Sequence, residues 1–188
     1  MPLSATARRH RADLAELAGL AESDLSIVFR DVSSAAVVKE ALNDTLPRLV
    51  EVYGSAAASL GADWYDELRE QAEVRGRFRA IVAELPDLGR TESLAGFAVS
   101  PLFGAKPDAT IALSKAAGGL QRIIYNADRD TVTRSSVQDR QARGWRREGT
   151  GKCDLCALIL TRDAVYTEES SQFETHDNCG CIGVPDFG

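Results

Sequence analysis

The sequence lacks any apolar run that approaches the length of a bilayer-spanning helix. Its most apolar stretches, such as 56–60 and 109–113, are five residues long, whereas a spanning helix needs about 20. The first fourteen residues are rich in charge and have no apolar core of the kind found in signal peptides. We therefore expect a soluble protein that is made in the cytoplasm and has no membrane partner.

Histidine is also scarce, which limits the catalytic mechanisms open to the chain. The only two histidines are His10, in a charged N-terminal segment, and His176, which lies among cysteines. Neither position suits the rigid triad of a nucleophilic enzyme. The sequence contains no G-x-S-x-G, no H-E-x-x-H, no phosphate-binding glycine loop and no deaminase motif. These absences predict that the protein is not an enzyme.

Basic residues do not dominate the composition. The chain has 22 lysines and arginines against 28 acids, a formal net charge of −6 and a pI near 5.0. This balance argues against a protein that coats DNA throughout. One basic stretch, between Arg122 and Arg147, has seven arginines and three acids. A solvated helix face is the commoner explanation. The alternative is a contact with DNA or an acidic protein surface through Arg134, Arg140, Arg143, Arg146 and Arg147.

Cysteine is rare, and its positions are the most informative feature of the chain. All four cysteines and one histidine fall in the last thirty-six residues. They form the pattern C-x2-C, nineteen intervening residues and H-x2-C-x-C, whose members are Cys153, Cys156, His176, Cys179 and Cys181. Thiolates and imidazole are soft or borderline donors, and two chelating pairs at this spacing are typical of a structural Zn²⁺ site. The nearby glycines Gly149, Gly151, Gly180 and Gly183 suit the tight turns of a zinc knuckle.

Five candidate ligands compete for the four positions of a tetrahedral site. The matched x2 spacings favour Cys153, Cys156, His176 and Cys179. Residues two apart tend to point to opposite sides of an extended chain, so Cys181 is expected to face away unless Gly180 turns the backbone. A four-cysteine site with His176 beside it is the alternative.

Two interpretations of the cysteines without a metal also stay open. Disulfides need an oxidising compartment, which the N-terminal sequence does not predict. A thioredoxin-type dithiol needs a βαβ pattern around the C-x2-C motif, and the preceding sequence does not have one.

The rest of the chain predicts helices. With 188 residues, it can hold one substantial core and a small appendage. Apolar residues recur every three or four positions in a first helix capped by Ser4 or Thr6 and in a second that starts at Ser33 or Ser34. Pro47 is expected to kink or split the second helix. Further helices are predicted at about 91–99 and 108–139.

Small residues mark two places where helices can pack closely. The segment 54–61 has only one large side chain, and glycines 118 and 119 interrupt the last long helix. Packing within the chain is the simpler explanation of the first segment, and contact with a partner chain is the alternative. The pair of glycines predicts a bend or a close helix contact.

These patterns define a mainly α fold class. We expect a multi-helix body over residues 1–140 and a zinc-binding C-terminal module over 141–188. Trp145 leads into this module, and a short β-hairpin is predicted around 157–167.

A series of short motifs runs through the C-terminal block: Gly144-Trp145-Arg146-Arg147, Gly151-Lys152-Cys153-Asp154-Leu155-Cys156, Ala164-Val165-Tyr166, Phe173, His176-Asp177-Asn178-Cys179-Gly180-Cys181 and Val184-Pro185-Asp186-Phe187. Two motifs in the helical region accompany them: Asp63-Trp64-Tyr65-Asp66-Glu67-Leu68-Arg69 and Gly118-Gly119-Leu120-Gln121-Arg122-Ile123-Ile124. Together they resemble Mu-F-like minor head proteins of tailed bacteriophages, in particular those of phages that infect actinobacteria. The resemblance covers most of the chain.

The resemblance implies a minor capsid protein of the virion that is present in few copies inside the capsid. It also implies association with the portal protein and the major capsid protein, and a role in head assembly or DNA packaging that begins in the host cytoplasm. Packaged DNA is a further partner that the resemblance implies. Relatives are often labelled capsid maturation proteases, so a head-processing enzyme is the alternative function.

Overall fold

The computed structural model describes residues 4–30, 34–103, 105–149, 154–161, 164–167 and 176–188. Its helices are α1 Ala5–Ser26, α2 Ala35–Leu49, α3 Ser55–Gln71, α4 Leu88–Ala98, α5 Ala109–Gln138 and α6 Asp154–Leu160. Its strands are β1 Gly144–Glu148 and β2 Ile182–Asp186, which pair antiparallel. The mainly helical fold class with a small C-terminal sheet is confirmed.

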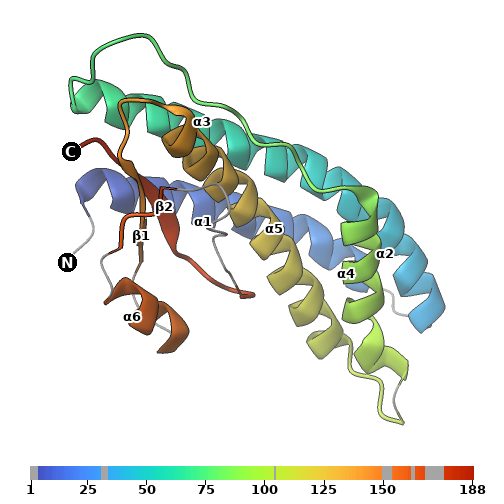
Figure 1. Cartoon of the computed structure of the whole chain (residues 1–188). Coiled ribbons are helices and arrows are strands. Elements are labelled where there is room, and N and C mark those ends of the chain that lie inside the picture. Colours follow the sequence, from blue (N-terminus) through green and yellow to red (C-terminus); the bar gives the residue numbers. More distant parts are fainter. Residues whose placement is uncertain (1–3, 31–33, 104, 150–153, 162–163, 168–175) are drawn as a thin grey trace.

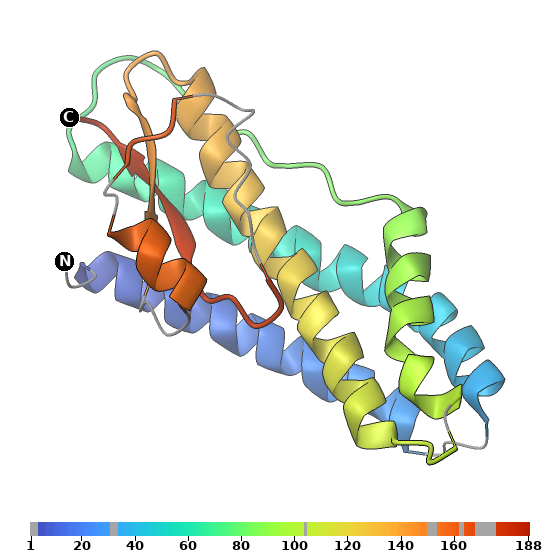
Figure 2. The same ribbon diagram turned by 60° about the horizontal axis from the view of Figure 1, so that its bottom comes forward.

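The long helices lie side by side around α5. Helix α5 packs against α1, α3 and α4, and α4 also packs against α2 (Figure 1). The two-stranded sheet lies beside the C-terminal half of α5, and α6 lies near the end of β1 (Figures 1 and 2). Among the described residues, none of the helices combines the length and the apolar character that a bilayer crossing requires.

Side-chain caps explain where the helices begin. Ser4 Oγ accepts a hydrogen bond from the Ala7 amide at 3.0 Å, and Ser34 Oγ accepts one from the Val37 amide at 3.3 Å. These caps satisfy amide groups that have no partner in the first helical turn. Of the alternatives offered by the sequence, Ser4 and Ser34 are therefore the residues that cap the first two helices.

The second predicted helix changes type rather than breaking. Pro47 lies near the end of α2, and a π-helical turn over Val50–Gly54 connects α2 to α3. Proline lacks the amide that would bond to the preceding turn, yet Pro47 lies inside α2 and the helix continues past it. The change of type comes after Pro47, at 50–54, so the split predicted at Pro47 is not found there.

Glycines and alanines allow α5 to approach its neighbours closely. A Cβ atom on Gly61 would lie 2.7 Å from Asp128 Oδ1 and 3.0 Å from the Asp128 carbonyl oxygen. A Cβ atom on Gly119 would collide with Cδ1 of Leu94. The small-residue segment of α3 therefore packs within the chain. Gly119 makes the close helix contact that the sequence predicts, whereas Gly118 faces Asp177, where a Cβ atom would lie 3.2 Å from the Asp177 Cβ.

The sheet joins residues that are distant in the sequence. Trp145 is opposite Pro185 in the antiparallel register, and its backbone N–H and C=O bond to Tyr166 on the other side of the strand. Proline has no N–H to donate, so it is tolerated opposite a residue whose backbone groups are satisfied elsewhere. The β-hairpin predicted around 157–167 is wrong, because residues 154–160 form α6 and β1 pairs with β2 instead.

The hydrophobic core extends across the predicted boundary at residue 140. Ile182 of β2 is fully buried in the same cluster as the core residues of the helices, and Val184 and Phe187 pack against that cluster. The aromatic ring of Phe187 contacts the ring of Tyr65 at a centroid distance of 5.6 Å. The C-terminal strand thus completes the core of the helical bundle.

Substitution of Gly61 tests the close approach of α3 and α5. We expect Gly61→Ala to lower the free energy of unfolding by about 1–3 kcal/mol, because the added methyl group meets the backbone of Asp128. Gly19→Ala is the matched control, since nothing lies within 4 Å of its Cβ position, and it should stabilise α1 by about 0.5–1 kcal/mol. Urea denaturation followed by circular dichroism measures both changes. A Gly61→Ala protein as stable as Gly19→Ala would contradict the packing described.

Candidate metal centre

Three cysteines from two segments meet in the C-terminal part of the fold. Cys156 lies on α6, whereas Cys179 and Cys181 lie just before β2. All three are buried, with 3–5% of each residue exposed. Their sulfur atoms lie within 4.8 Å of one another, and the Cys156 and Cys179 sulfurs are 3.8 Å apart. The three thiols therefore form one cluster that can hold a metal ion.

His176 points a ring nitrogen at the same cluster. Its Nε2 atom lies 3.5 Å from Cys156 Sγ, and its Nδ1 atom lies 2.7 Å from the carbonyl oxygen of Asp177. A carbonyl oxygen can only accept, so Nδ1 carries the proton and the neutral ring presents the Nε2 lone pair toward the sulfurs. A backbone acceptor on the outer nitrogen is the usual way to orient a metal-binding histidine.

Two separations, both from the Cys156 sulfur, match tetrahedral coordination rather than disulfide bonding. With metal–sulfur distances of about 2.3 Å and metal–nitrogen distances of about 2.0–2.1 Å, tetrahedral ligands lie about 3.8 Å apart for S···S and about 3.6 Å apart for S···N. The observed distances are 3.8 Å and 3.5 Å. A disulfide would require about 2.05 Å. The 3.8 Å separation therefore argues against a disulfide between Cys156 and Cys179.

The structure brings three of the five candidate ligands, Cys156, Cys179 and Cys181, within 4.8 Å of one another. His176 lies beside Cys156 but not within that distance of all three sulfurs, and Cys153 lies outside the described residues. The expectation that Cys181 faces away from Cys179 is wrong, because both sulfurs belong to the cluster. Residues 179–181 precede the strand instead of forming part of it, so the alternation of an extended chain does not apply there.

Arg129 is the functional residue that the sequence analysis missed. It lies on α5, is fully buried, and donates from Nη2 to the Cys179 carbonyl at 2.6 Å and from Nε to the Cys181 carbonyl at 2.8 Å. Its Nη1 atom donates to Asn126 Oδ1 at 3.0 Å, which fixes the guanidinium on its helix. The sequence placed Arg129 in a basic stretch explained as a solvated helix face, and for this residue that explanation is wrong.

Two further contacts attach the cysteine loop to the helical body. Arg11 of α1 donates from Nε to the Gly180 carbonyl at 2.8 Å, and Arg122 of α5 lies 3.3 Å from Asp177 in an ion pair. Gly149 closes the cluster from the side of β1, since a Cβ atom there would lie 2.5 Å from Cys181 Sγ. The cluster is therefore enclosed by α1, α5, α6 and the residue after β1.

The thiols interact electrostatically with one another and with Arg129. The hydrogen bond from the Cys181 thiol lowers the pKa of Cys179 to about 4, and the positive charge of Arg129 acts in the same direction while burial opposes it. The same hydrogen bond, together with burial, raises the pKa of Cys181. Burial lowers the pKa of Arg129, and the charges of Cys179 and Asp128 counteract that effect. The site thus favours negative charge on the Cys179 sulfur and disfavours it on the Cys181 sulfur, so that the two thiols share one proton.

Comparison with known proteins assigns the chain to a family. The family model described as VG15 protein matches residues 1–188. The chain belongs to the VG15 protein family. This is a family of viral or phage gene products, consistent with a phage protein. No curated protein and no solved structure matches the chain. The phage origin implied by the sequence resemblance is thus supported, while the Mu-F-like role stays a prediction.

Substitution of Arg129 tests its role in this VG15-family protein. We expect Arg129→Gln to lower the free energy of unfolding by about 2–5 kcal/mol, because two buried carbonyl groups lose a charged donor. The matched control is Arg134→Gln, on the same helix and half-buried, which should change the stability by about 0.5 kcal/mol or less. Urea denaturation gives both values, and limited proteolysis locates the loss. Equal stability of the two variants would contradict the clamping role of Arg129.

Proposed function

We propose that this protein is a structural minor capsid protein of a tailed phage, with a C-terminal tail held by a zinc ion. The observation that carries the zinc site is the cluster of three buried cysteine sulfurs within 4.8 Å of one another. His176 Nε2 lies 3.5 Å from one of them, that of Cys156, and would supply the fourth ligand. This donor set suits zinc, and four protein ligands leave no coordination position open for a substrate. The zinc ion would therefore crosslink the tail rather than take part in a reaction.

Charge balance supports the choice of a doubly charged ion. Three thiolates, one neutral imidazole and Zn²⁺ carry a net charge of −1, and the adjacent guanidinium of Arg129 carries +1. A buried charge is tolerated when it is paired and hydrogen-bonded, and Arg129 meets both conditions with the carbonyls of Cys179 and Cys181. A fourth thiolate from Cys153 in place of His176 would leave one uncompensated negative charge, so we favour the three-cysteine, one-histidine set with Cys181 as a ligand.

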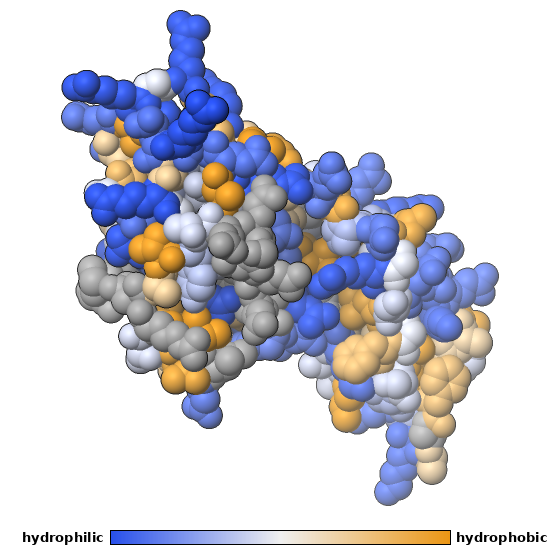
Figure 3. All heavy atoms as spheres, in the orientation of Figure 1, coloured by the Kyte–Doolittle hydropathy of each residue, from blue (hydrophilic) through white to orange (hydrophobic). Residues whose placement is uncertain are grey.

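Membership in a family of phage gene products and the resemblance to Mu-F-like minor head proteins support a location inside the capsid. An exposed apolar surface at one end of the bundle supports binding to other head proteins, of which the portal protein and the major capsid protein are the proposed partners. It lies where α1 ends and α5 begins (Figures 1 and 3). The large apolar residues there, each at least half exposed, are Ile27, Val37, Phe97, Phe103 and Ile111. Exposed apolar side chains grouped in this way commonly mark protein interfaces.

The surroundings of the two histidines support a structural role rather than catalysis. His10 is 2% exposed, lies 2.8 Å from Asp128 Oδ1 through Nε2, and stacks on Trp64 at a centroid distance of 4.0 Å. A general base must reach a substrate, and His10 is enclosed by α1, α3 and α5. His176 lies at the metal cluster, where its lone pair faces the sulfurs.

Serine substitution of a cysteine tests the zinc-held tail. We expect Cys156→Ser to abolish the binding of one zinc ion per chain and to expose the tail to protease, since zinc binding contributes on the order of 10 kcal/mol to such folds. The helical circular dichroism signal should remain largely intact. Cys153→Ser distinguishes the ligand sets, because zinc should be retained if Cys156, His176, Cys179 and Cys181 are the ligands and lost if Cys153 is one of them.

The matched control is Leu158→Ser, which changes an exposed residue of the same helix and should retain the metal and the protease resistance. Elemental mass spectrometry and thiol titration before and after denaturation complete the measurement. A wild-type protein without metal and with fewer than four titratable thiols would mean disulfides and would refute the zinc site.

The location in the head is tested on purified phage particles. We expect mass spectrometry to detect a few copies of the protein per head, and the purified protein to bind the portal protein. Phe97→Ser with Phe103→Ser should weaken that binding, because it removes two exposed aromatic side chains. Val52→Ser is the control, since Val52 is also exposed but lies on the π-helical turn between α2 and α3. Cleavage of scaffold or capsid protein by the purified protein would instead support the maturation-protease alternative.

A further inference from the structure

Two arginine-bearing segments meet at the end of the molecule opposite the exposed apolar surface. The first is 74–80, in the extended connection after α3, and the second is 138–144, in the turn between α5 and β1. Together they contain five arginines and one acid, Asp139, which is buried. This is a marked local excess of positive charge in a chain whose net charge is −6.

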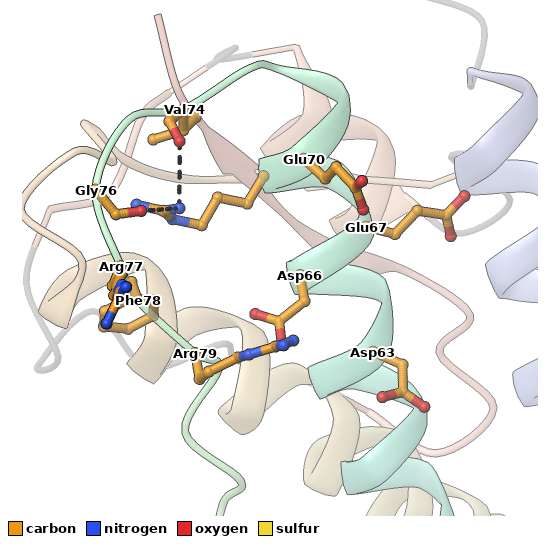
Figure 4. Close-up of a pocket in the computed structure, with 10 residues that line it drawn as sticks. Asp63, Asp66, Glu67, Glu70, Val74, Gly76, Arg77, Phe78 and Arg79 are labelled. Atoms are coloured by element: carbon orange, nitrogen blue, oxygen red, sulfur yellow. Dashed lines mark hydrogen bonds and ion pairs between the residues drawn. The ribbon is translucent and has the colours of Figure 1, made fainter.

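A single buried side chain, Arg69, fixes the two segments next to each other. Its Nε atom donates to Asp139 Oδ2 at 2.8 Å, which anchors it to the second segment. Its other nitrogens donate to the carbonyl oxygens of Arg75 and Gly76, both at 3.1 Å, and of Val74 at 3.4 Å. Figure 4 labels Val74 and Gly76 of the first segment, and dashed lines mark the hydrogen bonds that their carbonyl oxygens accept. The two segments therefore lie within the reach of one guanidinium group.

Further contacts hold both segments in place. Ile81 and Ala83 donate their amides to the side chains of Ser135 and Thr131 on α5, at 2.8 and 2.9 Å. The Arg143 amide donates to the Asp186 carbonyl at 2.7 Å, which attaches the second segment to β2. The arginines are thus presented on an ordered backbone, which reduces the entropy lost when they bind a ligand.

The exposed arginines at this end only partly coincide with those the sequence singled out, since they share Arg140 and Arg143 with that set. Arg75, Arg77, Arg140 and Arg143 are exposed, and strongly hydrophilic side chains project from this end in Figure 3. Arg146 instead forms an ion pair with Asp186 at 3.1 Å. The basic surface therefore combines the end of the predicted stretch with a segment more than sixty residues earlier in the chain.

Acids on α3 border this surface but are partly neutralised. Asp63, Asp66, Glu67 and Glu70 line an open cavity beside Arg77 and Arg79 (Figure 4). Asp66 pairs with Arg79 at 3.0 Å, and Glu67 pairs with Arg9 at 2.7 Å. A polyanion is thus expected to approach from the outer side, over Arg75, Arg77, Arg140 and Arg143, and to avoid the acidic wall.

We propose that Arg75, Arg77, Arg140 and Arg143 form a surface that binds the phosphate backbone of double-stranded DNA. Guanidinium groups match the geometry of phosphate oxygens, and repeated arginines suit a ligand with regularly repeated charge. The aromatic residue between the arginines, Phe78, packs on Tyr65 at a centroid distance of 5.9 Å. It is therefore directed to the core rather than to the stacking of unpaired bases, which favours a duplex. The proposal does not rest on the metal centre or on the head-protein role.

The experiment uses fluorescence anisotropy to measure how the 188-residue protein binds a labelled DNA duplex over a range of salt concentrations. The duplex has about 25 base pairs, which exceeds the site size of single-stranded binding folds. In one variant, Arg75, Arg77, Arg140 and Arg143 are all replaced by glutamine. The control variant loses the same charge elsewhere on the exposed surface, through Arg30→Gln, Lys39→Gln, Arg48→Gln and Arg90→Gln. A third variant carries lysine at the four surface positions and keeps their charge.

The variant with glutamine at the four surface positions should bind the duplex on the order of tenfold more weakly, or weaker still. The magnitude of its slope of log affinity against log salt should fall by about 0.9 for each phosphate that the protein no longer neutralises. The control variant and the lysine variant should retain most of the wild-type affinity. Equal weakening of the surface and control variants would overturn the proposal, as would undetectable wild-type binding at low salt. Tighter binding to single strands, or equal competition by polyglutamate, would overturn the choice of duplex DNA. Circular dichroism and metal content, measured on every variant, separate a folding defect from a binding defect.

Discussion

The contact between the Arg129 guanidinium and the main chain of the cysteine loop is the interaction on which the C-terminal part of the fold depends. Arg129 belongs to α5, the helix that contacts α1, α3 and α4, and it donates to the carbonyls that flank the clustered sulfurs. Burying a guanidinium is costly unless every donor is used and negative charge is near. The thiols, the neighbouring Asp128 and the carbonyl groups meet that requirement, so the cluster and α5 stabilise each other.

Close packing around α5 makes this contact available. Gly61 and Gly119 let the backbones of α3 and α4 approach it, and this leaves no room for side chains at the contacts. Next to Arg129 on α5, Asp128 pairs with His10 of α1, and the His10 ring stacks on Trp64 of α3. Three helices are thereby fixed at the level of residue 128, one residue before Arg129. The position of the cysteine loop is thus determined by how tightly the helices pack.

The two ends of the bundle differ in chemical character. One end exposes large apolar side chains, among them Phe97 and Phe103, and the other exposes arginines from two segments. The metal centre lies on the flank, enclosed by α1, α5 and α6. A protein partner at one end and DNA at the other are compatible with this separation, because neither contact would cover the cysteines.

Local patterns in the sequence predicted the helices, their caps and the cysteine cluster. Ser4 and Ser34 cap helices where they were expected to, and Cys156, Cys179 and His176 converge as their spacing indicates. These features depend on residues close in the chain or on ligand chemistry that few residue types can supply. The predicted hairpin at 157–167 was wrong because its apolar residues are equally compatible with a short helix, and only the pairing of β1 with β2 decides between them.

The sequence by itself determined the helical class, the cysteines that cluster and the places where small residues permit close packing. Only the tertiary structure decided that Cys181 faces the cluster, that Arg129 is buried while Arg140 is exposed, and that Arg69 joins 74–76 to Asp139. The physical reason is that periodicity and spacing describe interactions along one segment. The burial of a charged side chain depends on carbonyl groups and acids that distant segments bring to it.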